Sequence, residues 1–142
     1  MKTDETNPAD WFMLAQERLE KADALYKEFG ASYTGVELLQ GVVERYLKGY
    51  LIGKGWSLQK IHNLSTLLDA AVERDSQFKS FADLCEELTA QYWEQHYPGG
   101  DLAEVGADYE DLRRQAGELI ALILAAVPPT EPTDKPASPG TA

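Results

Sequence analysis

Cysteine and histidine are scarce in this chain. Cys85 is the single cysteine, so no intrachain disulfide can form and the disulfide-rich scaffold of small secreted domains is excluded. Its apolar sequence neighbours predict a buried, unreactive thiol. The two histidines, His62 and His96, lie 34 residues apart, and with one cysteine they make no structural zinc set. Residues 53–55 (GKG) lack the spacing and the preceding strand of a phosphate loop, so we expect neither a metal nor a cofactor.

Long apolar runs are absent as well. The longest, residues 119–127 (LIALILAAV), has nine residues, whereas a membrane-spanning helix needs about 20. The first seven residues are polar and no apolar stretch follows them, which differs from a secretory signal. We therefore expect a cytoplasmic protein without a membrane contact.

Basic residues are outnumbered. Lys and Arg total 13 against 24 Asp and Glu, which gives a net charge of −11 at neutral pH. Such a charge repels phosphate backbones and argues against non-specific nucleic-acid binding over the whole surface. Arg45, Lys48 and Lys60 are able to focus positive potential near His62, which leaves a local phosphate-binding groove open.

Proline is concentrated at one end of the 142 residues. Five of the seven prolines fall in residues 128–142, where no large apolar residue occurs. With nothing to bury against the entropy cost of ordering, this segment is predicted to be a disordered tail. Residues 1–6 are predicted to be a flexible N-terminus and residues 7–127 to form one helical domain.

Within residues 7–127 the apolar residues recur at helical spacing, and no stretch alternates convincingly with period two. Asn7 and Pro8 predict the start of a first helix that Gly30 ends. Further helices are predicted at residues 35–52, 64–72, about 78–93, and from about residue 109. Four of the helices are long and amphipathic, so we expect an all-α fold, an up-and-down four-helix bundle with an extra short helix.

Most aromatic residues lie on the apolar stripes of these helices. We therefore expect Trp11, Tyr26, Tyr46 and Trp93 in the core or in a dimer interface rather than in base stacking. Trp56 lies off any stripe, which favours a place at the surface.

Three segments share features with one known family. They are residues 39–51 (LQGVVERYLKGYL), residues 60–68 (KIHNLSTLL) and residues 92–98 (YWEQHYP). In this order and at these separations they resemble the second helix, the His-Asp-Leu-like turn and the Arg-Tyr-Pro segment of HEPN domains (higher eukaryotes and prokaryotes nucleotide-binding). The resemblance extends over about residues 11–123.

The resemblance implies a bundle of four or five helices that is usually a dimer. Many HEPN proteins are encoded beside a small nucleotidyltransferase or fused to one. Some are ribonuclease toxins whose reaction depends on an Arg followed, after four to six residues, by a His. Others lack that motif and are thought to bind nucleotides or partner proteins.

The ribonuclease motif is missing from this sequence. The positions where the motif would place Arg hold Gly55, Trp56 and Ser57 before His62, and Thr89, Ala90 and Gln91 before His96. The Arg of the family's Arg-Tyr-Pro segment is replaced as well. RNA cleavage by such a site needs an acid or base near neutral pH and a cation for the phosphate. The missing Arg therefore favours a non-catalytic protein, and no catalytic residue is assigned.

Gln40, Glu44 and Lys48 recur every four residues and form a polar stripe on one helix. They are either a solvated face with a favourable Glu44–Lys48 pair or the polar wall of a groove between subunits, as the resemblance suggests. Asn63 is predicted to cap the helix after it, and His62 either hydrogen-bonds within that turn or is a titrating ligand of the groove. The candidate ligand or groove residues are Gln40, Glu44, Arg45, Lys48, His62, Asn63 and Tyr97.

Three hypotheses follow from these residues and from the resemblance. The first is a dimeric, non-catalytic HEPN-like module that binds a nucleotide or a nucleotidyltransferase partner in a toxin–antitoxin-type context. The second is an RNA-cleaving enzyme with an altered site around His62 and His96. The third is a helical protein-interaction module without a small ligand.

Overall fold

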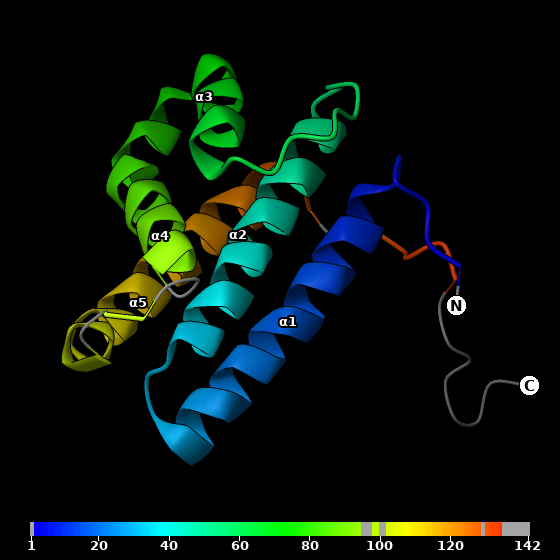
Figure 1. The fold of residues 1–142 in the computed structure, drawn as a ribbon. Helices are drawn as coiled ribbons and strands as arrows, with labels where there is room; N and C mark the ends of the chain where they lie inside the picture. The colour runs from blue at the N-terminus through cyan, green and yellow to red at the C-terminus, as the bar shows by residue number, and fades with distance from the viewer. Residues whose placement is uncertain (1, 95–97, 100–101, 129, 135–142) are drawn as a thin grey trace, which may run out of the picture.

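The computed structural model describes residues 2–94, 98–99, 102–128 and 130–134, and for residues 102–104 only the backbone (Figure 1). Its elements are α1 (Pro8–Phe29), α2 (Tyr33–Gly53), α3 (Leu64–Arg74), the 3-10 helix η1 (Ser76–Phe81), α4 (Ala82–Glu94) and α5 (Leu102–Ala126). These described residues form no strand, so the predicted all-α fold is confirmed.

Helix α2 is the centre of the fold. It packs against α1, α3, α4 and α5, and Figure 1 shows α1 on one side of it and α3 with α4 on the other. Its composition explains this position, because apolar side chains occupy most of its circumference rather than one stripe. The α2 residues that are fully buried include Val36, Leu39, Val42, Val43, Leu47 and Leu51.

The helix ends follow local capping chemistry. Asn7 Oδ1 accepts the backbone N–H of Ala9 at 3.0 Å, and Gly30 ends α1 with a φ of 78°, as predicted. Asn63 Oδ1 accepts the N–H of Thr66 at 3.1 Å, which confirms its role as the cap of α3. Helix α2 begins two residues earlier than predicted because Ser32 caps it.

Helix α5 begins at Leu102, well before the predicted start near residue 109. Val105 and Tyr109 are buried and extend the apolar stripe toward the N-terminus of the helix. Gly106 lies between them, and a glycine in a helix interior weakens the sequence signal.

Two aromatic residues lie wholly or partly at the surface. Trp93 is 63% exposed, because it lies in the last turn of α4, away from the core-facing stripe. Its predicted place in the core is therefore wrong, whereas a place in a dimer interface stays a prediction. Trp56 is partly exposed, as predicted, and the rest of it packs against the core, because the chain after α2 folds back and the backbone N–H of Trp56 donates to Leu51 O at 2.9 Å. Cys85 is buried as predicted, and burial raises the pKa of its thiol to about 12, which keeps it protonated.

The two ends of the described chain meet at Asp10, which is only 2% exposed. Its carboxylate accepts the N–H of Asp4 at 2.7 Å and the N–H of Thr133 at 2.8 Å. Burial opposes ionisation of Asp10, but the hydrogen bonds from Thr133 and Asp4 outweigh it and lower the pKa of this carboxyl. The polar composition of residues 1–6 and 128–142 did not predict these contacts, because one buried carboxylate makes them rather than apolar burial.

Candidate functional site

Two adjoining cavities lie along the polar side of α2. The first, of about 410 Å³, is lined by Gln40, Glu44, His62, Asn63, Thr89, Tyr92 and Trp93. The second, of about 540 Å³, is lined by Arg18, Thr34, Glu37, Leu38, Gln40, Gly41, Glu44, Arg45, His62 and Tyr92. We call the two together the α2 cleft, since Gln40, Glu44, His62 and Tyr92 belong to both.

Glu44 pairs with two basic groups: His62, which lines the cleft with it, and Lys48, a predicted groove residue that lines neither cavity. Its Oε2 lies 3.1 Å from Lys48 Nζ and 3.2 Å from His62 Nδ1. The side chain of Glu44 is 14% exposed, that of Lys48 5% and that of His62 76%. The predicted Glu44–Lys48 pair is therefore confirmed, but it is not a solvated face. Lys48 Nζ is instead covered by the ring of Trp11, 5.6 Å away.

His62 lies at the open mouth of the cleft. Its partner Glu44 comes from a helix 18 residues earlier in the chain, rather than from the turn that contains His62. When Nδ1 carries the proton and donates it to Glu44, Nε2 is the acceptor nitrogen of the ring. This geometry leaves the exposed imidazole able to accept a hydrogen bond from a ligand.

Three residues of the cleft come from α4 and were not among the predicted ligands. Thr89 donates its hydroxyl to Cys85 O at 2.8 Å, which fixes its side chain along the helix. Tyr92 and Trp93 contact each other edge to face, with ring centroids 5.6 Å apart. An exposed indole beside polar groups is the type of surface on which nucleobases stack. Tyr97, the remaining predicted residue, lies outside the described residues.

Arg18 also lines the cleft, although it was not among the predicted residues. It lies on α1 on the same helix face as the buried Ala15 and Ala22, and the packing of α1 against α2 brings it to the cleft. There it lines the cleft beside Arg45, whose Nη1 donates to Gly41 O at 3.1 Å. Burial and the charge of Arg18 both lower the pKa of Arg45, while Glu44 acts in the opposite direction.

A comparison with known protein families identifies the family of this chain. The pattern of the HEPN domain matches residues 9–126, which is most of the chain and agrees with the resemblance over residues 11–123. The chain belongs to the HEPN domain family. No curated protein and no solved structure matches it.

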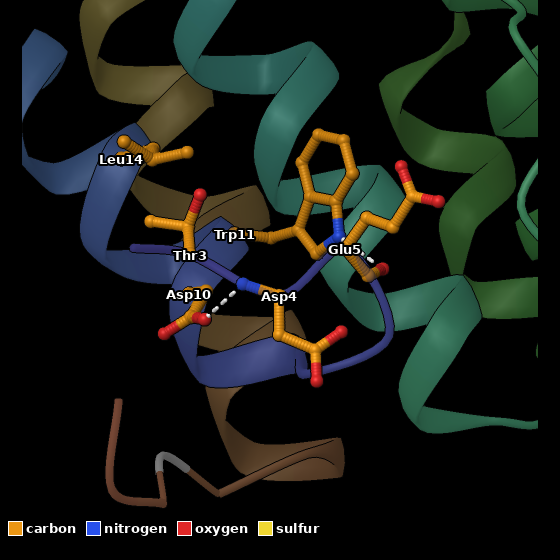
Figure 2. Close-up of a pocket in the computed structure, with 6 residues that line it drawn as sticks. All are labelled: Thr3, Asp4, Glu5, Asp10, Trp11 and Leu14. Atoms are coloured by element: carbon orange, nitrogen blue, oxygen red, sulfur yellow. Dashed lines mark hydrogen bonds between the residues drawn. The ribbon is translucent and has the colours of Figure 1, made fainter. Parts of the chain in front are cut away.

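Other features of this HEPN domain are less suited to a ligand. A third cavity, of about 130 Å³, lies between the N-terminal turn and α1. Figure 2 shows its lining residues, among which the backbone N–H of Asp4 donates to the Asp10 carboxylate and Trp11 Nε1 donates to Glu5 O. This cavity is smaller than the range of about 300–1,000 Å³ that is typical of small-molecule sites. In the part of the chain that the structure describes, no three metal-ligating side chains gather at one place, and no helix is long and apolar enough to cross a membrane.

Proposed function

We propose that this HEPN domain binds a nucleotide in the α2 cleft and catalyses no reaction on it. The observation that carries the proposal is the convergence of three separate segments on one cleft: α2, residues 62–63 and the end of α4. They bring an exposed aromatic side chain and several hydrogen-bonding side chains to one cavity. Each cavity of the cleft has a volume within the usual range for small-ligand sites.

The base of the nucleotide lies against α4 in this proposal. Trp93 offers an exposed indole face, and stacking on such a ring is worth about 1–3 kcal/mol per base. Gln40 and Asn63 carry side-chain amides on the same cavity, and amides pair with the donor and acceptor edges of bases.

Trp93→Ala is therefore expected to weaken binding of ATP or GTP about tenfold, because it removes the stacking surface. Isothermal titration calorimetry of the wild type and of W93A measures the two affinities. Phe29→Ala is the matched control, since Phe29 is also a large exposed aromatic residue, 75% accessible, but lines neither cavity of the cleft. Equal affinities for wild type and W93A would contradict the placement of the base. An absence of binding at millimolar nucleotide would contradict the function and favour an interaction module without a small ligand.

RNA cleavage is the second candidate function, and one observation favours it. The Glu44–His62 pair lies on the same cavity as Arg18 and Arg45, so an acid–base group and cations for a phosphate are close together. The missing spacing between Arg and His argues against it.

We expect the purified protein to cleave a mixed RNA pool no faster than the double variant H62A/H96A, at low and at physiological salt. Gel analysis of the RNA after incubation with each protein gives the comparison. Cleavage that the double variant abolishes would reverse the order of the two functions and make His62 or His96 an acid–base residue.

The assembly that family membership suggests is also a proposal. We propose a cytoplasmic homodimer that pairs with a nucleotidyltransferase in a toxin–antitoxin-type context, supported by Phe29, a large hydrophobic side chain that is 75% exposed. Light scattering at micromolar concentration is expected to give about twice the chain mass of 15.8 kDa. A monomer mass over that whole concentration range would remove the dimer from the proposal.

A further inference from the structure

Two arginines from different helices lie side by side on one wall of the α2 cleft. Gly41 brings them together because it has no side chain. A Cβ atom at Gly41 would lie 3.1 Å from Arg45 Nη1, 3.3 Å from Arg18 Cδ and 3.4 Å from Arg18 Nε. Both guanidinium groups therefore pack against the same turn of α2.

The charges of these two arginines are not neutralised by a close carboxylate. Among the described residues, no carboxylate oxygen lies within 4.0 Å of either guanidinium group, whereas Arg113 pairs with Asp23 at 2.8 Å and Arg114 with Asp111 at 2.6 Å. Two like charges held close together repel each other, and burial strengthens the repulsion. In a chain with a net charge of −11, an arginine pair of this kind is an attractive site for an anion.

The acidic residues of the same cavity do not cancel this attraction. Glu37 and Glu44 line it with the arginines, and Glu44 already accepts hydrogen bonds from Lys48 and His62. Lys48 and His62 pair with Glu44, although Glu44 also acts on Arg45 through its charge. Arg18 and Arg45 bring two positive charges to the same cavity, and this pairing of guanidinium groups favours an anion there.

We infer that Arg18 and Arg45 form a subsite for the phosphate groups of the nucleotide, so that the ligand is a nucleoside polyphosphate rather than a nucleoside. The inference rests on the proposed function and adds the orientation of the bound nucleotide in the cleft. The base lies at Trp93, the phosphates lie at Arg18 and Arg45, and His62 lies on the part of the cleft that both cavities share. A guanidinium fork donates two parallel N–H bonds to a phosphate, which suits it to this role.

The test uses three probes: ATP, adenosine and inorganic pyrophosphate. Their affinities are measured by calorimetry for the wild type and for R18Q, R45Q and R74Q. Arg74 is the matched control, because its Nη1 donates to the carbonyl of Ala70 four residues back, as Arg45 does to Gly41, but it lies on α3 outside the cleft.

R18Q and R45Q are each expected to lower ATP affinity about tenfold or more, while R74Q leaves it unchanged. Adenosine is expected to bind the four proteins equally, because it carries no phosphate. R45K keeps the charge without the planar fork and is expected to fall between R45Q and the wild type. Thermal melts of each variant identify any loss of affinity that comes from unfolding.

The outcomes separate this inference from the proposed function. Equal ATP affinity for wild type, R18Q and R45Q would overturn the phosphate subsite and leave nucleotide binding in place. If the wild type binds neither ATP nor adenosine, the proposed function is wrong, and pyrophosphate decides the subsite by itself. Pyrophosphate binding that R18Q and R45Q lose would support an anion site, and an absence of pyrophosphate binding to the wild type would overturn it.

Discussion

Replacing Glu44 by leucine is expected to lower the free energy of unfolding by about 3 kcal/mol, because the substitution leaves a buried ammonium without its counter-charge. Lys48 Nζ lies 3.1 Å from Glu44 Oε2, and the Lys48 side chain is only 5% exposed. The cation–π contact with Trp11 remains but is worth about 1 kcal/mol, too little to replace the carboxylate. Chemical denaturation of the wild type and of E44L measures the difference.

Two further variants show whether the loss comes from charge or from packing. The double variant E44L/K48M removes both charges and is expected to recover most of the lost stability, because an apolar pair of similar volume fills the same space. Glu17 and Lys21 form a second pair with the same spacing along a helix, 3.0 Å apart but in solvent, and E17L is expected to leave stability nearly unchanged. If E44L is as harmless as E17L, the burial of Lys48 does not depend on Glu44.

Gly49→Ala is expected to destabilise the protein by about 1–2 kcal/mol, although alanine is the better helix former. A Cβ atom at position 49 would lie 2.5 Å from Phe12 Cε1 and 2.8 Å from Phe12 Cδ1. The Phe12 ring is buried and stacks against Tyr46 with centroids 5.5 Å apart, so it has no free space in which to move. The close approach of α1 to α2 therefore requires glycine at this position.

Gly106→Ala is the matched control, because Gly106 is also inside a helix but a Cβ atom there would meet nothing within 4 Å. It is expected to raise the melting temperature, since alanine in an open helix position gains about 1 kcal/mol over glycine. The two alanine variants thus shift the melting temperature in opposite directions. A rise in both would show that α1 and α2 do not pack closely at Gly49.

The helices were predictable from the sequence where local chemistry determines them. Asn7, Gly30 and Asn63 each act on a backbone group within a few residues, so their role as caps can be read without knowing the fold. The start of α5 was missed because Gly106, a weak helix former, interrupts the apolar stripe to which the buried Val105 and Tyr109 belong. The contacts of Asp10 were missed because Thr133 is 123 residues away in sequence.

The residues of the candidate site were predictable where they share one helix face, because helical spacing is a local property of the sequence. Gln40 and Glu44 share a helix face by their spacing, and both line the cleft. Helical spacing does not reveal that Trp11 covers Lys48, because that contact depends on how α1 crosses α2. The places of Arg18 and Trp93 depend on tertiary packing too, since each belongs to a helix other than the one that carries the polar stripe.

Nuclear magnetic resonance tests nucleotide binding in the α2 cleft most directly. Two-dimensional spectra of the ¹⁵N-labelled protein are recorded while ATP is added, and each backbone amide reports on its own surroundings. The proposed site predicts that the amide shifts concentrate at Gln40, Gly41, His62 and Thr89, with α5 residues such as Gly117 unchanged. No shift at millimolar ATP, or shifts centred on residues 3–14 around the cavity of Figure 2, would contradict it.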